Sequence, residues 1–138
     1  MKFDPKGSTV SMATMTAFTE CLVSPDLLAV PGIGPVTKTN LMEKDTIDNT
    51  FQLIGVFLRL KGGDMNMVQH TEAFAYYLES CGVSNSNHRN SIVLAIAEKV
   101  NTLFNGSGLF NPDEYSQVLE QMKAQEESDE VIAEEEEQ

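Results

Sequence analysis

The residues of this chain that are best suited to bind a ligand form a short turn, Pro31-Gly32-Ile33-Gly34-Pro35. Gly32 and Gly34 carry no side chain and can take positive φ, so the turn can be tight and an anion can approach its main chain closely. Pro35 stands where a helix would begin, because a missing N–H costs nothing at the first helical position. The unpaired N–H groups and the positive dipole end of that helix attract anions. The turn therefore predicts a main-chain site for phosphate.

We expect the phosphate to belong to the sugar-phosphate backbone of double-stranded DNA. The predicted contact residues are Gly32, Ile33, Gly34, Val36, Thr37 and Lys38. Contacts to phosphate position a protein on the duplex without reading bases, so the binding would be independent of sequence. The alternative is a tight turn between two packed helices that has no ligand.

Charge opposes this binding, and its distribution along the chain decides how strongly. The net charge is −12, from 9 Lys and Arg against 21 Asp and Glu. Residues 1–110 contain eight basic and ten acidic residues, whereas residues 111–138 contain one Lys and eleven acidic residues. The acidity is thus mostly C-terminal. The remaining body is near neutral and lacks the basic patch that counter-ion release from DNA requires.

Helices must position the turn, because the apolar residues recur with helical spacing. Residues 1–8 are predicted to be flexible, and residues 9–106 to form a compact all-α domain of five helices. The expected helices cover 9–22, 35–44, 49–60, 64–81 and a segment from the polar turn at 84–87 to about 104, with a short helical turn at 27–30. The helix at 49–60 is apolar on nearly every side, which is typical of a core or an interface. No apolar run approaches the roughly 20 residues of a membrane span.

The C-terminal part is predicted to contain a linker and an amphipathic helix at 107–125, followed by an acidic tail. Asn111 is a helix cap, Pro112 a first helical residue, and the apolar face consists of Tyr115, Val118, Leu119 and Met122. We expect this helix to dock on the body or on a protein partner. Residues 126–138 can bury only Val131, Ile132 and Ala133, which cannot offset the entropy of ordering, so a disordered tail is expected. Such a tail aids solubility, guards a ligand site or holds a basic partner.

The turn resembles the general helix-hairpin-helix signature, and a longer series of blocks is similar to the barrier-to-autointegration factor family over residues 18–104. The blocks are Leu27-Leu28, Pro31-Gly32-Ile33-Gly34, Leu41, Ile54-Gly55-Val56-Phe57-Leu58-Arg59-Leu60-Lys61, Tyr77-Leu78-Glu79-Ser80-Cys81-Gly82, Arg89 and a helix that ends near Phe104. The resemblance implies a small all-helical homodimer that bridges DNA in chromatin and at the nuclear envelope. The dimer face is assigned to the apolar helix at Phe51, Ile54, Phe57 and Leu58, for which the core is the alternative.

This sequence departs from the family at the residues that would bind DNA. The family's lysine in the helix after the hairpin falls on Asn40, and its lysine in the turn before the last helix falls near Ser86. Lys38 can substitute in part if its side chain extends outward to a phosphate. About six extra residues around 62–69 add a loop. The resemblance therefore supports the fold more strongly than the ligand.

Motifs for enzyme chemistry are missing from the sequence. It has no Gly-rich phosphate loop followed by Lys-Ser/Thr, no nucleophile elbow and no paired carboxylates in the body. His70 and His88 are isolated, and Cys21 and Cys81 lack metal-ligand spacing, which indicates reduced thiols. We expect no catalytic residue, no cofactor and no metal, and an intracellular location in the nucleus, the cytoplasm or both.

Two functions are consistent with these patterns. The first is a non-enzymatic, homodimeric protein that binds or bridges double-stranded DNA through the hairpin. The second is a helical interaction or scaffold protein of the same fold that has lost DNA binding. The resemblance favours the first, and the charge favours the second. The positions of Lys38, Lys44, Arg89 and Lys99 discriminate between them, because cations gathered beside the hairpin would support DNA binding and scattered cations would support the scaffold.

Overall fold

The computed structural model describes the backbone of residues 1–137 and the side chains of residues 1–132. Its elements are α1 (Met12–Glu20), the 3-10 helix η1 (Leu27–Ala29), α2 (Pro35–Asp45), α3 (Thr50–Arg59), α4 (Met67–Ser80), α5 (Ser86–Leu103) and α6 (Pro112–Glu137). Within residues 1–137 no strand is present, so the predicted all-α class is confirmed. None of the helices in this range is both long and apolar enough to cross a membrane.

Polar side chains fix where the helices begin, and they shift some boundaries from the predicted ones. The Ser11 side chain accepts from the N–H of Thr14, so α1 starts at Met12 rather than at residue 9. Asn66 and Gln69 form a reciprocal capping box, which starts α4 at Met67 rather than at Asp64. Because these caps depend on individual polar side chains, apolar periodicity alone could not locate them.

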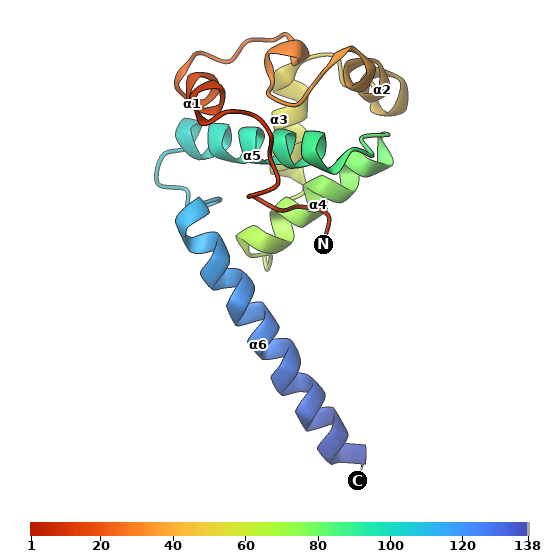
Figure 1. Cartoon of the computed structure of the whole chain (residues 1–138), viewed down its shortest axis with the longest axis vertical. Coiled ribbons are helices and arrows are strands. Elements are labelled where there is room, and N and C mark those ends of the chain that lie inside the picture. Colours follow the sequence, from red (N-terminus) through yellow and green to blue (C-terminus); the bar gives the residue numbers. More distant parts are fainter. Residues whose placement is uncertain (138) are drawn as a thin grey trace.

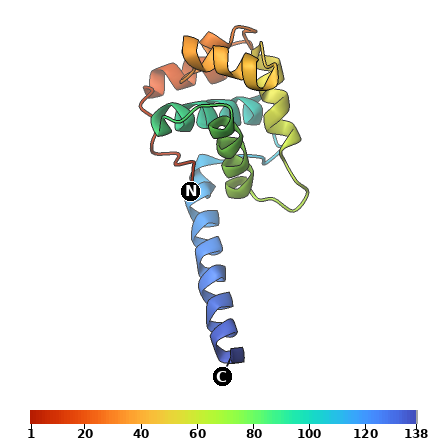
Figure 2. The same ribbon diagram turned by 90° about the vertical axis from the view of Figure 1, so that its right-hand side faces the viewer.

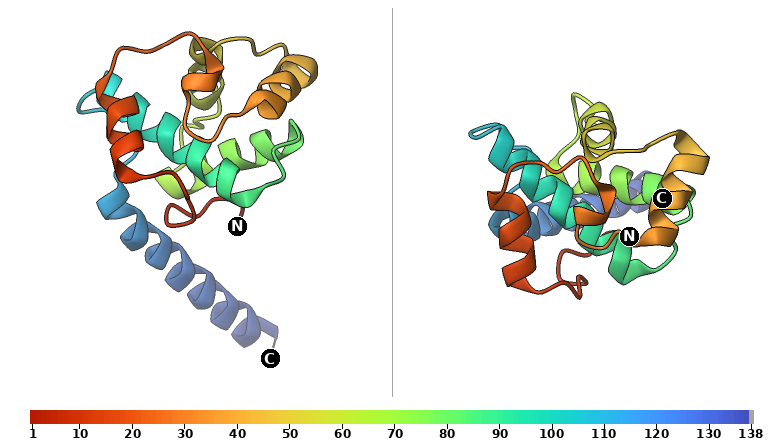
Figure 3. Two further views of the ribbon diagram at one scale, coloured as in Figure 1. Left: turned by 45° about the horizontal axis from the view of Figure 1, so that its top comes forward. Right: turned by 90° about the horizontal axis from the view of Figure 1, so that it is seen from above.

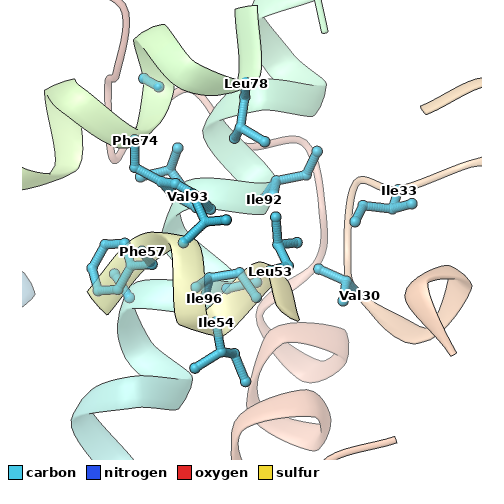
Figure 4. Close-up of a cluster of buried hydrophobic side chains, with 14 of the residues drawn as sticks. Val30, Ile33, Leu53, Ile54, Phe57, Phe74, Leu78, Ile92, Val93 and Ile96 are labelled. Atoms are coloured by element: carbon cyan, nitrogen blue, oxygen red, sulfur yellow. The ribbon is translucent and has the colours of Figure 1, made fainter. Parts of the chain in front are cut away.

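Helix α5 lies at the centre of the body, packed against α1, α3 and α4 (Figure 1). Ile92, Val93 and Ile96 of α5 are fully buried and meet apolar side chains of α3 and α4, as Figure 4 shows. The rings of Phe57 and Phe74 pack edge to face with centroids 5.2 Å apart. Each such side chain contributes about 1.5–3 kcal/mol on burial, so this cluster holds the helices together.

The N-terminal segment is packed, and the prediction that residues 1–8 are flexible is wrong. Phe3 is buried, with its ring edge-on to Tyr115 of α6 at a centroid distance of 5.7 Å. The carboxylate of Glu72 on α4 accepts the N–H groups of Lys2 and Phe3, and Asn90 on α5 accepts the N–H of Asp4. In Figure 1 this segment crosses the front of α5. A single large apolar residue and its paired backbone groups therefore order a segment of otherwise polar composition.

Helix α6 docks on the body with its first part and then projects from it (Figures 1 and 2). Tyr115 is buried, and Val118, Leu119 and Met122 pack against the core from partly buried positions. The helix continues to Glu137, so the prediction of a disordered tail from residue 126 is not what the structure shows. Extending an existing helix adds a hydrogen bond for each residue ordered, and Glu, Gln and Ala favour this conformation. A side-chain hydrogen bond from Gln125 to Asp129 adds support one turn apart.

His70 is fully buried in the core beside Phe57. Its Nε2 atom donates to the carbonyl oxygen of Phe57 at 2.6 Å, and the two rings stack with centroids 4.0 Å apart. No residue whose side chain is described gives a partner to Nδ1. Burial lowers the pKa of His70 below 6.5, and the charge of Lys61 acts in the same direction, while the hydrogen bond to Phe57 acts against it. Protonation of His70 therefore opposes folding.

We predict that the contribution of His70 to stability is complete above pH 6.5 and is lost as the pH falls below that value. In that range the unfolded chain binds a proton that the folded chain excludes, so the free energy of unfolding decreases. Urea denaturation about one pH unit above and below 6.5 measures the difference. The His70→Gln variant should lose much of this pH dependence, whereas His88→Gln, at an exposed position, should keep it. An equal pH dependence in all three proteins would contradict the assignment.

Candidate nucleic-acid interface

Gly32 lets the predicted turn lie directly on α5. Its φ is +94°, a left-handed conformation that L side chains rarely adopt. A Cβ atom at this position would lie 2.8 Å from the carbonyl oxygen of His88 and 2.9 Å from Cβ of Ser91. The turn itself is closed by a hydrogen bond from the N–H of Ile33 to the carbonyl of Val30, at 3.0 Å. The close approach therefore needs glycine for two reasons, conformation and space.

Gly34 has a different role from the predicted one. Its φ is −105° and its ψ is −176°, an extended conformation open to any residue, so positive φ is not required there. It is the N-cap of α2, without a capping side chain, and Pro35 is the first helical residue as the sequence suggested. Within the described residues, no atom lies within 4 Å of a Cβ built on Gly34. The glycine leaves open space in front of the N-terminus of α2.

This open space is a pocket of about 360 Å³. Its walls are the start of α2, the connection between α4 and α5, and the start of α5, with Gly34, Pro35, Val36, Thr37, Asn40, Gly82, Val83, Ser84, Asn85 and His88 as lining residues. Figure 1 shows the α4–α5 connection beside α2, and the view from above in Figure 3 agrees. Two helix N-termini thus border one pocket, and each carries a positive partial charge of about half a unit.

The lining offers hydrogen-bond donors without formal charge. It contains no Lys, Arg, Asp or Glu. Across the described part of the chain, the N–H groups of Val36 and Thr37 have no acceptor, because Lys38 donates the first N–H bond of α2, to Gly34. At the other wall Asn85 caps α5 and accepts from the N–H of His88 at 3.0 Å. An anion in this pocket would meet main-chain groups, polar side chains and the apolar side chains of Pro35, Val36 and Val83.

Asn40 of α2 packs against the α4–α5 connection. Gly82 has a φ of +99°, and a Cβ there would lie 3.0 Å from Nδ2 of Asn40. The short amide of Asn40 therefore helps to hold α2 next to Gly82. The pocket keeps its shape at this point without a cation.

The structure separates the predicted contact residues into three groups. Gly34, Val36 and Thr37 line the pocket. Gly32 faces α5 and Ile33 is buried in the core below the turn, where Figure 4 shows the Ile33 side chain near Val30. Lys38 lies outside the lining and pairs with the carboxylate of Asp26 at 3.8 Å, with both side chains about half exposed. Sequence reasoning missed Ser84, Asn85 and His88 as lining residues. The polar turn at 84–87 was recognised, but nothing in the sequence indicated that it faces α2.

The four cations Lys38, Lys44, Arg89 and Lys99 are scattered and do not gather beside the glycine turn. Lys99 is buried, and its amine donates to the carbonyl oxygens of Phe18, Thr19 and Cys21 at the end of α1. This places a positive charge on the negative end of that helix, where it is stabilising.

Arg89 is buried at the start of α5 and is also used internally. Its guanidinium donates to the carbonyls of Lys2 and Val83 at 3.0 and 3.1 Å and lies 3.6 Å from the carboxylate of Glu79. Lys44 is in the last turn of α2, at the opposite end from the pocket. Of the four cations only Lys38 is in the first turns of α2, and this arrangement favours the scaffold hypothesis.

Two of the four residues assigned to a dimer face are inside the single chain. Phe57 is fully buried and Ile54 is 7% exposed, so neither presents a surface to a second copy. Phe51 is 57% exposed, and Leu58 is partly buried. The alternative that this helix belongs to the core is correct for Ile54 and Phe57, because α5 covers that side of α3. A face that includes Phe51 and Leu58 stays open to a partner.

Metal-ligating side chains do not gather anywhere among residues 1–132, where no group of three or more His, Cys, Asp or Glu could hold an ion. Cys21 is exposed and Cys81 is buried, both as free thiols.

We predict that substitutions at the two hairpin glycines have different effects on stability. Gly32→Ala places a methyl group against His88 and Ser91 at positive φ and should lower the free energy of unfolding by about 1–3 kcal/mol. Gly34→Ser adds a capping hydroxyl in an extended conformation and should leave stability unchanged or slightly raised. Denaturant unfolding of both variants measures this. Equal destabilisation would mean that the turn does not pack on α5 as described.

Comparisons of the chain with protein-family models, with curated proteins and with solved structures gave no match. Function is therefore inferred from the residues and their geometry.

Proposed function

We propose that the chain is a non-enzymatic protein that binds double-stranded DNA independently of sequence, with η1, the glycine turn and α2 acting as a helix-hairpin-helix. One observation carries the proposal. Two helix N-termini border a single pocket, and its lining contains no acidic residue in a chain that has 21 of them. The resemblance to the barrier-to-autointegration factor family points to the same ligand. It also points to a protein that acts on DNA in the nucleus or the cytoplasm.

The proposed mode of binding is main-chain recognition of a phosphate. Val36 and Thr37 would donate their N–H groups to one phosphate, and the open position at Gly34 would let the DNA backbone approach. A charge at a helix N-terminus gains about 0.3–1 kcal/mol per helix, which is modest. Lys38 could add to the attraction for phosphate once its amine no longer pairs with the carboxylate of Asp26. Weak binding with a shallow salt dependence is the expected result.

A DNA titration tests this proposal. Fluorescence anisotropy with a short duplex should give a log–log salt slope near −1, because about one phosphate would be neutralised by Lys38. The chain without residues 126–138 is measured in parallel to remove general repulsion. Absence of binding by both chains at low salt would refute DNA binding.

The Gly34→Asp variant tests the role of the pocket in DNA binding without destabilising the fold. Asp is a good N-cap, so the variant should be as stable as the parent protein, while its carboxylate in the pocket should abolish DNA binding. Gly63→Asp is the matched control, because it makes the same charge change at a glycine that also has open space around it and does not line the pocket. If both variants lose affinity equally, the loss reflects net charge and the pocket is not the binding site.

A second candidate function is a helical interaction or scaffold protein without DNA binding. Arg89 and Lys99 favour it, since both are buried on backbone carbonyls and are unavailable to DNA. The partly open face of α3 provides a surface for self-association, with Phe51 exposed and no atom of the described chain within 4 Å of a Cβ on Gly55. Both candidate functions include a homodimer through this face.

Sedimentation tests the dimer and helps to separate the two functions. Phe51→Glu should convert a dimer to a monomer, because a charge would be buried in the interface without a partner. Met42→Glu, at another exposed apolar residue on α2, should not. A dimer that fails to bind DNA at low salt would support the scaffold. A parent chain that is monomeric at high concentration would exclude the dimer from either function.

A further inference from the structure

Another groove lies between the N-terminal segment, α1 and α5. It shares no residue with the pocket at the N-termini of α2 and α5. We call it the α1–α5 groove. It has a volume of about 430 Å³ and is lined by Pro5, Ser8, Val10, Met12, Met15, Thr16, Leu94 and Glu98. The N-terminal segment forms one wall because it is held across α5, for example by the hydrogen bond between the hydroxyls of Ser8 and Ser91 at 2.8 Å. The groove is therefore built from ordered elements.

The groove is mainly apolar and offers adaptable side chains. Val10, Met15 and Leu94 supply buried or partly buried apolar surface, and Met12 is 84% exposed at the edge. Methionine is unbranched and polarisable, so it can pack against apolar groups of different shapes. A large exposed methionine next to such a hollow is a feature of surfaces that bind partner peptides.

Glu98 is the charged residue of the groove, and its side chain is half-buried. It makes no ion pair and no hydrogen bond with any residue of the part of the chain whose side chains are described. The next residue, Lys99, is committed to the carbonyls of α1. Burial raises the pKa of the Glu98 carboxyl above 4.5. A half-buried carboxylate without a partner opposes folding in the isolated chain, and a cation in the groove would relieve this.

We propose that the α1–α5 groove binds a basic segment of a partner protein, in which an apolar side chain enters among the methionines and an adjacent Lys or Arg pairs with Glu98. Among the lining residues Glu98 alone carries a charge, so the groove favours a cationic segment. A second copy of this chain is disfavoured as the occupant because it offers few cations to Glu98: Arg89 and Lys99 are buried, and Lys38 pairs with Asp26. DNA is disfavoured too, because Glu98 would face its phosphates.

Selection of short random peptides on the immobilised full chain tests the proposal. The enriched peptides should combine a large apolar residue with a nearby Lys or Arg. Glu98→Gln should weaken their binding about tenfold, the effect of losing a partly buried charge pair. Glu120→Gln on α6 is the matched control, because it removes the same charge from an exposed position outside the groove and should leave the affinity unchanged.

Two further readouts distinguish this binding site from a structural role of Glu98. The methyl NMR signals of Met12 and Met15 should shift on addition of a selected peptide, and the signal of Met42 on α2 should not. Glu98→Gln should also slightly raise the midpoint of thermal unfolding, because it removes the charge of a half-buried carboxylate that has no partner. The proposal is overturned if the selected peptides lack basic residues, if they bind Glu98→Gln as well as the parent chain, or if their contacts fall on α6.

Discussion

The close approach of the Gly32 backbone to α5 is the contact on which the candidate site depends. With the Cα of Gly32 seated over His88 and Ser91, the glycine turn cannot move away from the start of α5 without leaving a gap in the core below Ile33. This fixes the start of α2 next to the start of α5 and creates the pocket between them. Gly82 on the opposite wall makes the same kind of approach, to Asn40. Two glycines at positive φ thus set the distance between the two helix N-termini.

The positive charges of the body serve the fold more than the surface. Lys99 and Arg89 are both buried and donate to backbone carbonyls, Lys99 at the C-terminal end of α1 and Arg89 in two segments that are distant in sequence. Lys99 ties α1 to α5, and Arg89 ties the N-terminal segment to the start of α5. A cation with these contacts is expensive to remove but contributes little to long-range attraction of a polyanion. The surface is therefore more negative than the count of residues implies.

The structural features that depend on local sequence patterns could be predicted. The helices follow from apolar spacing, and the glycine turn and Pro35 follow from conformational preference. The burial of Arg89 and Lys99 could not be predicted, because it depends on which carbonyls lie opposite them in the folded chain. The same applies to Phe3, whose ordering needs Tyr115 from the other end of the sequence. The convergence of α2 and α5 on one pocket also arises from packing between residues about fifty positions apart.

The projecting part of α6 makes the molecule electrically asymmetric. A helix of 26 residues extends about 39 Å at 1.5 Å per residue. In Figures 1 and 2 it points away from α2, so most of the negative charge is held at the far end of the molecule from the hairpin. Screening acts over about 8 Å at physiological ionic strength, much less than this length. The acidic arm should therefore not weaken the field at the pocket. Instead the arm should orient the protein, because a polyanion would repel the arm and contact the helical body first.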